Sequence, residues 1–354
     1  MSSIRLKKSD KPFVITGPCS AETEEQMMLT AKQLHEHVNF NLLRAGIWKP
    51  RTRPDSFAGV GEMGLSWLVE AGKSIGKPTA TEVANSKHVE AVLKAGVDVL
   101  WIGARTTANP FAVQEIADAL KGVDVPVLIK NPINPDLDLW IGAFERLDNA
   151  GVKQLGAIHR GFSVYKPIHY RNIPSWEIPI RLTEKIPGVF LINDPSHIAG
   201  KSDFVKEVAQ KAMDLNFDGL MIEAHCKPDD AWSDKDQQLT PAQLALLFQA
   251  LILRSADVSV LNQDSIHLIR EKIAELDDQM FEIVSSRMRL CEDLGVYKRE
   301  HNLTILQPEH WRNTLSKRIE KKEGYQLSED FIRKLMDAIH QESIQHQINV
   351  MNRE

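Results

Sequence analysis

Eight short apolar runs, spaced almost evenly over the first 225 residues, constrain the fold of this 354-residue chain most strongly. Each run has the length and composition of a buried β-strand. The runs are residues 13–16, 41–46, 78–82, 99–105, 126–130, 154–160, 189–194 and 219–225. They are apolar nearly throughout, which is typical of parallel strands covered by helices.

Amphipathic helical patterns separate most of these runs. The first, at 23–37, begins at Thr23, a residue type that commonly caps a helix, and the pattern at 86–96 ends in a glycine. The others cover 109–122, 138–151, 201–216 and 240–254. Eight strand–helix units in about 250 residues predict an α/β fold of the (β/α)8 barrel type. An open doubly wound sheet is the alternative, although such a sheet rarely needs eight units so evenly spaced.

Composition excludes several classes of protein. Hydrophobic residues make up 43% of the chain and charged residues 26%, as in ordinary soluble globular proteins. The net charge of −5 gives no reason to expect a nucleic acid or an anionic membrane as partner. We find neither an apolar run long enough to span a membrane nor a signal peptide. Three cysteines cannot all pair, so we expect reduced thiols and a cytoplasmic location.

The predicted strand ends carry the functional signal. In (β/α)8 barrels the reactive residues lie at the C-terminal ends of the strands. Here nearly every predicted strand ends on a charged or metal-binding side chain, namely Cys19, Arg44, Lys49, Glu82, Arg105, Lys130, Arg160, His197 and Glu223. Chance would scatter such residues over both ends. The pattern therefore predicts one site at the C-terminal mouth of the barrel.

One subset of these residues is cationic. It comprises Arg44, Lys49, Arg51, Arg105, Lys130 and Arg160. Like charges on one rim repel each other unless they bind anions, and guanidinium groups suit phosphate and carboxylate. A single surface arginine usually pairs with a local acid, but this explains six on one rim poorly. We therefore predict ligands with more than one phosphate or carboxylate group.

A second subset combines a thiol, an imidazole and two carboxylates. Its members are Cys19, His197, Glu223 and Asp234. Such a mixed set of ligands suits a divalent first-row metal ion, and the spacings exclude a compact zinc finger. Each residue taken alone has an ordinary alternative: a buried core cysteine, a structural histidine or a solvated turn acid. Only their common place at the barrel mouth favours a metal site.

The motifs of residues 1–255 resemble those of 3-deoxy-D-arabino-heptulosonate 7-phosphate (DAHP) synthase, of the short type I-beta subgroup. They are GPCSAE (17–22), RAGIWKPRTRPDSF (44–57), IGAR (102–105), HRG (159–161), NDPSH (193–197) and the Glu223…Asp234 pair. The KPRT element is the specific part. A related family that makes 3-deoxy-octulosonate 8-phosphate typically carries an Asn-Arg-Ser version of that loop. The resemblance implies a barrel enzyme that condenses phosphoenolpyruvate (PEP), erythrose 4-phosphate and water to DAHP and phosphate.

The resemblance also implies roles for the two subsets. The residues implied to bind substrate are Arg105, Lys130 and Arg160, with Arg44 in support, for PEP, and Arg51 and Thr52 for the aldose phosphate. The subset that contains Cys19 is implied to hold a divalent ion that polarises the aldehyde. Manganese is expected, and iron, cobalt or zinc is possible. Lys49 is implied to protonate the forming alkoxide.

Beyond residue 255 the character of the sequence changes. Residues 256–263 have the features of a linker, and 264–354 form a second domain with helical patterns at 264–301, 308–324 and 328–350. Three helices of unequal length make a poor monomeric core, so we expect a partner surface.

Helix geometry separates the cations of the first of these patterns. Arg287 and Lys298 are eleven residues apart, about 20° in phase and about 16 Å along the axis, so they can face one small dianion. Arg270 lies about 42 Å from Lys298 on a straight helix and cannot reach the same ligand. It is either an ordinary surface arginine or part of a site in a second chain.

Residues 264–350 resemble an all-helical chorismate mutase of the AroQ class, which is an intertwined homodimer. The residues that carry the resemblance are Arg270, Leu276, Asp277, Arg287, Lys298, Ser343 and Gln347. The resemblance implies that Arg270 of the partner chain, Arg287 and Lys298 grip the substrate. Ser343 and Gln347 share one helix face, and Lys298 and Gln347 are implied to bond the ether oxygen of chorismate.

Three positions depart from that family. Gln307, His310 and Trp311 stand where an aspartate, an arginine and a glutamate are common. The departures weaken the expectation of full mutase turnover but leave binding of chorismate or prephenate in place. Two compatible functions stay open for the second domain: a working mutase, or a module through which such a ligand inhibits the barrel.

Overall fold

The structure, a computed structural model, describes residues 4–9, 11–50, 56–165, 169–254 and 263–352. The chain divides into two compact units, Met1–Ala256 and Asp257–Glu354. The first unit is an α/β barrel and the second is helical. Within the described ranges, no helix is long and apolar enough to cross a membrane.

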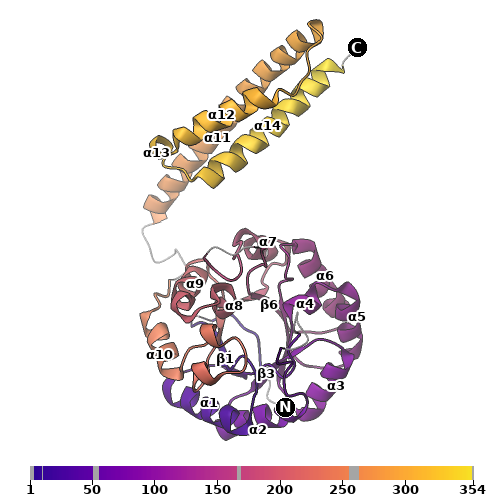
Figure 1. Cartoon of the computed structure of the whole chain (residues 1–354), viewed down its shortest axis with the longest axis vertical. Coiled ribbons are helices and arrows are strands. Elements are labelled where there is room, and N and C mark those ends of the chain that lie inside the picture. Colours follow the sequence, from indigo (N-terminus) through magenta and orange to yellow (C-terminus); the bar gives the residue numbers. More distant parts are fainter. Residues whose placement is uncertain (1–3, 10, 51–55, 166–168, 255–262, 353–354) are drawn as a thin grey trace. The chain divides into compact units, whose positions relative to one another are not determined.

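The first unit is built on a closed barrel of eight parallel strands, which Figure 1 shows inside a ring of helices. The strands are β1 Phe13–Gly17, β2 Leu42–Arg44, β3 Thr79–Val83, β4 Val99–Ile102, β5 Val127–Lys130, β6 Leu155–His159, β7 Phe190–Asn193 and β8 Gly219–Glu223. Each predicted run overlaps one of them, although the runs 13–16 and 78–82 each stop one residue before the end of the strand. Pairing of β1 with β8, from Phe13 opposite Gly219 to Gly17 opposite Glu223, closes the barrel and excludes the open sheet.

Helices follow the strands around the barrel. They are α1 Glu24–His37, α2 Met63–Ser74, α3 Ser86–Ala95, α4 Ala104–Thr107, α5 Pro110–Ala119, α6 Leu137–Asn149, α7 Glu177–Lys185, α8 Pro195–Ala199, α9 Ser202–Asp214 and α10 Pro241–Ala250, with short 3-10 turns at Pro228–Asp230 and Lys235–Gln237. The sequence patterns did not include α2 or α7. Two glycines interrupt α2, and a Cβ at Gly72 would lie 2.3 Å from Thr79 Cγ2, so the glycine lets this helix pack closely on β3.

Local signals set several helix ends. Thr23 caps α1 by accepting a hydrogen bond from the Gln26 amide, as its position in the sequence predicts. Asn85 caps α3 in the same way, and Gly96 ends that helix with φ at +81°. These signals keep such connections short: α3 ends at Ala95 and β4 already begins at Val99.

The alternation of side chains along each strand divides the core into two layers. One layer lies between strands and helices and includes Leu43 and Ile129. The other fills the barrel and includes Ile15, Leu128 and Trp101. Trp101 is almost fully buried and supports the predicted cations, because the Arg44 guanidinium lies 4.9 Å and the Lys130 ammonium 5.8 Å from its ring centroid.

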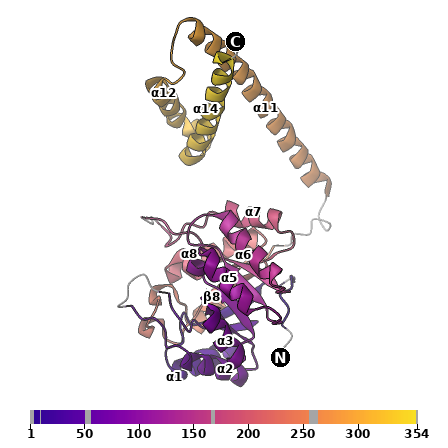
Figure 2. The same ribbon diagram turned by 90° about the vertical axis from the view of Figure 1, so that its right-hand side faces the viewer.

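The second unit consists of α11 Gln263–Glu300, α12 Pro308–Glu320, α13 Lys322–Tyr325 and α14 Glu329–Met351. Figure 2 shows α11 as the longest of these helices, and α14 packs against both α11 and α12. The pattern predicted at 308–324 is divided into α12 and α13 by a break at Lys321. Most of the predicted linker lies outside the described residues, but its last residue, Gln263, already belongs to α11.

Candidate active site

The thiol of Cys19 lies just beyond the end of β1, fully buried at the barrel mouth. Gly17 permits this placement, because its φ is +146° and a Cβ there would lie 2.0 Å from the Arg44 carbonyl oxygen. The Sγ atom of Cys19 donates to Oδ2 of Asp234 at 3.2 Å and accepts from Nζ of Lys49 at 2.8 Å. Asp234 itself has a left-handed backbone with φ at +47°.

His197 and Glu223 form the other half of the predicted metal set. Glu223 ends β8, and its Oε1 atom accepts no hydrogen bond from the described residues. His197 turns Nδ1 toward the carboxylate of Asp194, 2.8 Å from Oδ2, which leaves Nε2 3.9 Å from Oε1 of Glu223. A carboxylate on one imidazole nitrogen is the arrangement that orients metal-binding histidines.

Cations lie against this set in the structure. Nη1 of Arg44 is 3.2 Å from Oε1 of Glu223, and Nη1 of Arg171 is 2.9 Å from Oδ1 of Asp234. The ammonium group of Lys49 is the cation beside the Cys19 thiol. Within the described ranges, no three His, Cys, Asp or Glu side chains are arranged to hold a metal ion. The structure thus brings the four predicted ligands into two pairs, Cys19–Asp234 and His197–Glu223, with cations beside both.

The protonation states follow from burial and these charges. Burial and the neighbouring Glu223 carboxylate raise the pKa of the Cys19 thiol to about 12, so only a stronger cation would ionise it at neutral pH. Burial lowers the pKa of His197 against the pull of Asp194, which keeps the imidazole neutral. Burial opposes ionisation of Asp234, but Arg171 and Lys49 outweigh it and hold its pKa below the usual range. A neutral imidazole, two carboxylates and a shielded thiol fit a divalent ion.

The cations predicted to bind anions lie along the same mouth. Lys130 ends β5, and its Nζ atom is 2.8 Å from Oδ2 of Asp194. Arg160 follows β6 and donates from Nη1 to Oδ1 of Asn172 at 3.0 Å. Burial, with the positive charges of Arg171 and Arg105 nearby, lowers the pKa of Arg160 to about 10. Repulsion between the buried Arg160 and these more exposed cations favours an anionic ligand.

Arg105 is placed differently from the prediction, and two further predicted substrate residues are not described. Arg105 does not end a strand: β4 stops at Ile102, and Arg105 lies on α4 with an exposed side chain. Arg51 and Thr52 lie outside the described residues. The described stem before them includes Lys49, whose pKa is raised: burial lowers it, but Cys19 and Glu223 outweigh burial.

Sequence reasoning missed two residues that order the site. Asp194 bridges Lys130 and His197, and its place three residues before His197 in NDPSH was an available signal for a helix cap. Arg171 donates from Nη1 to both Asp234 and Gln237, at 2.9 and 2.8 Å. Nothing in the sequence around Arg171 indicates this contact, because it joins residues more than 60 positions apart.

The helical unit brings four predicted residues together. Nζ of Lys298 donates to Oε1 of Gln347 at 3.1 Å, and Nε2 of Gln347 donates to the Ser343 carbonyl at 3.2 Å. Arg287 donates from Nη1 to the Ser343 hydroxyl. Lys298, Ser343 and Gln347 are all buried. One polar cluster therefore lies between the second half of α11 and α14.

Arg270 is not part of this cluster. It lies in the first half of α11, where every residue from His267 to Ile283 is exposed in the single chain. The helix continues without a break to Glu300, so the separation of about 42 Å from Lys298 stands. The partner surface stays a prediction, and this exposed half of the helix is the part that it concerns.

The departures from the mutase pattern lie at the start of α12. Trp311 stacks on His340 of α14, with ring centroids 3.9 Å apart and planes 9° apart. Burial, with the nearby charge of Arg287, lowers the pKa of His340, so a neutral aromatic pair borders the polar cluster. Gln307 and His310 are exposed.

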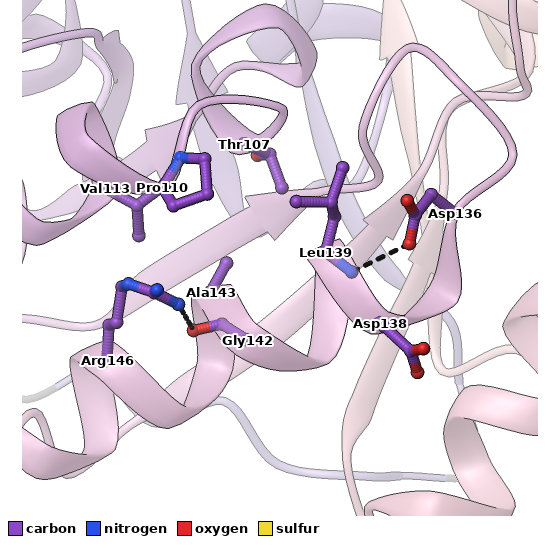
Figure 3. A pocket seen from close by; sticks show the side chains of 9 residues that line it. All are labelled: Thr107, Pro110, Val113, Asp136, Asp138, Leu139, Gly142, Ala143 and Arg146. Atoms are coloured by element: carbon purple, nitrogen blue, oxygen red, sulfur yellow. Dashed lines mark hydrogen bonds between the residues drawn. The ribbon is translucent and has the colours of Figure 1, made fainter.

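A separate cavity lies on the outside of the barrel, between α5 and α6 (Figure 3). Its volume is 340 Å³, and its lining includes Asp136, Asp138 and Arg146. Arg146 donates to the Gly142 carbonyl of its own helix at 2.8 Å. None of the candidate site residues lines this cavity, so it is distinct from the strand-end site.

The fold and the cationic strand ends define the class: a (β/α)8 barrel with a charged site at its C-terminal mouth. The chain belongs to the DAHP synthetase I family, whose sequence model matches residues 2–256. Residues 269–348 match the model of chorismate mutase type II. Both resemblances inferred from the motifs are thereby confirmed. DAHP synthases generally use a divalent metal ion.

Individual relatives agree with this assignment. Phospho-2-dehydro-3-deoxyheptonate aldolase of Thermotoga maritima is 31% identical over 227 residues, which are 64% of this chain and 64% of that protein. A 2-dehydro-3-deoxyphosphooctonate aldolase of Francisella tularensis is 27% identical over 63% of this chain and 84% of the relative.

Solved structures show the same barrel. The crystal structure of the Thermotoga maritima aldolase, also titled DAHP synthase, matches with a TM-score of 0.60 at 29% identity over 67% of each chain. A truncated form of 3-deoxy-D-arabino-heptulosonate 7-phosphate synthase from the same organism gives 0.58 at 27% identity, over 67% of this chain and 84% of that one.

Proposed function

We propose that the barrel condenses PEP with erythrose 4-phosphate and water to give DAHP and inorganic phosphate. One observation carries the proposal: the buried cations Lys130 and Arg160 lie beside the pairs Cys19–Asp234 and His197–Glu223 at one end of the barrel. A doubly anionic substrate and a carbonyl acceptor need these two kinds of surface side by side. Family membership supports the assignment.

The PEP subsite follows from the cations. Lys130 and Arg160 are both buried and offer their charge to the phosphate and carboxylate of PEP, with Arg105 at the exposed edge. Arg44 lies beneath them, against Glu223 and over Trp101, and supports the site from below. Binding the anion offsets the burial and the repulsion that together lower the pKa of Arg160.

The residues proposed to hold a divalent ion are Cys19, His197, Glu223 and Asp234. When bound, the ion, which we propose to be manganese, would polarise the aldehyde oxygen of the aldose as a Lewis acid. Asp194 keeps the His197 imidazole turned so that Nε2 faces the site. The Oε1 atom of Glu223 accepts no hydrogen bond from the described residues and lies 3.2 Å from Nη1 of Arg44, so it is a further possible metal ligand.

Lys49 is the proposed proton donor. Its ammonium group is held at the Cys19 thiol, and its raised pKa keeps it protonated at neutral pH. From this position it can give a proton to the alkoxide that forms when PEP attacks the aldehyde. Arg51 and Thr52, two and three residues further along the chain, are proposed from the sequence alone to bind the aldose phosphate.

The choice of aldose decides between the two activities found among the relatives. The KPRT element, residues 49–52, favours erythrose 4-phosphate over arabinose 5-phosphate. Mass spectrometry of the product formed from PEP with each aldose tests this choice. We expect the seven-carbon product only. Formation of the eight-carbon product in its place would overturn the proposal, and a Lys49→Met variant should form neither.

For the helical domain we propose the rearrangement of chorismate to prephenate. Lys298 and Gln347 form a buried donor pair for the ether oxygen, and Arg287 offers its guanidinium to a carboxylate. Loss of chorismate absorbance on incubation with the full chain would support this activity. Equal loss with a Lys298→Ala variant would contradict it.

We further propose a homodimer through α11. Apolar residues on the exposed half of this helix include Ile269, Ile273, Leu276, Phe281 and Ile283, each more than half exposed. Such a stripe needs a partner in water, and a second copy would bring its Arg270 to this chain's cluster. Sedimentation should give twice the chain mass, and a Phe281→Asp variant should shift toward monomer. Higher oligomers would build on this dimer.

Feedback inhibition is a second proposed role of the helical domain. Fusion of an early biosynthetic activity with a later one motivates it, since prephenate binding at the Arg287 cluster could report downstream product. Saturating prephenate should slow the barrel reaction of the full chain, and Arg287→Ala should abolish the inhibition without changing the basal rate. An unchanged rate in the unsubstituted chain would overturn this role.

The free thiols of Cys19, Cys226 and Cys291 accord with the cytoplasmic location that we propose.

A further inference from the structure

Trp48 immediately precedes Lys49, and its indole ring lies flat on the imidazole of His88. The ring centroids are 3.8 Å apart and the planes differ by 6°. We propose that His88 is a positioning residue for Lys49 and acts through this stacked pair. The inference rests on the proposed role of Lys49 as proton donor. Neither Trp48 nor His88 has a role in the proposed mechanism.

The His88 ring is anchored on the barrel side. His88 lies in the first turn of α3, where its backbone amide donates to the capping oxygen of Asn85 at 2.9 Å. Its Nδ1 atom accepts from the Ala84 amide at 3.3 Å, directly after β3. This bond requires an unprotonated Nδ1, and burial lowers the pKa of His88 although Glu82 and Glu62 oppose it. The imidazole is therefore a fixed, neutral platform.

The Trp48–Lys49 segment is held by hydrogen bonds at its backbone and at the Lys49 ammonium. The Lys49 amide donates to the Ala58 carbonyl at 2.8 Å, and the Gly61 amide donates to the Ile47 carbonyl at 3.4 Å, which closes the base of the loop. Between the loop and β3 lies a cavity of 160 Å³ whose lining includes Trp48, Lys49, Glu82 and His88. Space is therefore left open beside Lys49 on this side.

The stacked pair bridges the loop and the barrel beside that cavity. It joins the residue before the proposed proton donor to the first turn of α3. A flat ring contact restricts both translation and tilt of the segment that carries the Lys49 ammonium. Placement of a reacting group matters steeply, because an error of about 1 Å can cost about 100-fold in rate. The pair thus pre-sets Lys49 for proton transfer before the aldose arrives.

The test compares substitutions on both sides of the stack in the full chain. His88→Ala and Trp48→Ala should each lower kcat/KM for erythrose 4-phosphate on the order of 10-fold, with the KM for PEP unchanged. The double variant should be no worse than either single one, since both break one contact. His88→Phe keeps a flat ring and should recover to within about threefold of the unsubstituted enzyme. His37→Ala, on the exposed end of α1, is the matched control.

Hydrogen exchange supplies a readout that does not need turnover. Exchange at the Lys49 amide should be faster in His88→Ala and normal in His88→Phe. An unchanged kcat/KM in His88→Ala, additive losses in the double variant, or failure of His88→Phe to restore activity would each overturn the inference. If the unsubstituted enzyme forms no DAHP, the proposed function fails instead, and Lys49 exchange still decides whether the stack fixes this segment.

Discussion

The ammonium of Lys49 lies 2.8 Å from the thiol of Cys19, although 30 residues separate them in sequence. The proposed proton donor and a proposed metal ligand are therefore direct neighbours. The two groups are both held in their protonated forms. The thiol is too deeply buried to ionise alone, and the lysine keeps its proton because anionic groups surround it. Chemistry at the aldehyde and protonation of its oxygen thus share one corner of the barrel.

Asp194 should control the affinity for the metal ion without being a ligand. It holds the His197 imidazole and the Lys130 ammonium at once. An Asp194→Asn variant should bind manganese about 10- to 100-fold more weakly, as measured by competition with a fluorescent chelator. Asp203→Asn, an exposed acid of α9, is the control. Equal affinity in the Asp194 variant would show that His197 needs no such support.

Arg160 should contribute more to PEP binding than to catalysis. Its guanidinium is buried among like charges, so its removal takes away a charged donor that the PEP anion would pair with. Arg160→Ala should raise the KM for PEP about 10- to 100-fold. Arg146→Ala, beside the outer cavity of α5 and α6, should leave it unchanged. A lower kcat at constant KM would instead place Arg160 in the chemical step.

The buried histidine of the HRG motif should make stability depend on pH. Burial lowers the pKa of His159 to about 4, whereas the unfolded chain protonates near 6.5. The unfolded state therefore binds the extra proton, and stability present above pH 6.5 is lost as pH falls toward 4. The slope of this loss is about 1.4 kcal/mol per pH unit for one proton.

A His159→Gln variant isolates that contribution. Urea unfolding of both proteins between pH 4 and 7 can be followed by tryptophan fluorescence. The slope of unfolding free energy against pH should be smaller in the variant by up to one proton. Parallel curves would mean that His159 is protonated equally in both states.

Gln347 should matter for the rearrangement of chorismate. Its buried amide pairs with Lys298, at the place proposed for the ether oxygen. Gln347→Ala should lower kcat for chorismate by about 100-fold, in line with the loss of one preorganised donor. Gln345→Ala, two residues away and exposed, should have little effect. Similar rates in both variants would move the reacting atoms away from this cluster.

The barrel itself could be predicted because its signals are local and repetitive. Each strand run stands out from its helices by periodicity, and the C-terminal ends of parallel strands must share one rim. That rule was enough to bring Cys19, Lys130 and Glu223 to a single site. Helices α2 and α7 escaped notice for a separate reason: glycines interrupt the pattern of α2 and a proline that of α7, and packing on the barrel compensates.

The contacts that tune the site could not be predicted. Arg171 reaches Asp234, and Trp48 reaches His88, through loops whose paths no periodicity describes. Arg105 was placed at a strand end, but the chain turns into α4 before reaching it. The pairing of cations with the thiol and carboxylates likewise depends on three-dimensional distances that strand ends alone do not supply.

Phosphate release from PEP in the presence of erythrose 4-phosphate tests the central claim most directly. It should be measured on the full chain as purified, after chelation, and after manganese is added back. The account predicts activity that chelation abolishes and manganese restores. Activity that persists after complete removal of divalent ions would contradict the metal role of Cys19, His197, Glu223 and Asp234, and no phosphate release under any condition would contradict the synthase function itself.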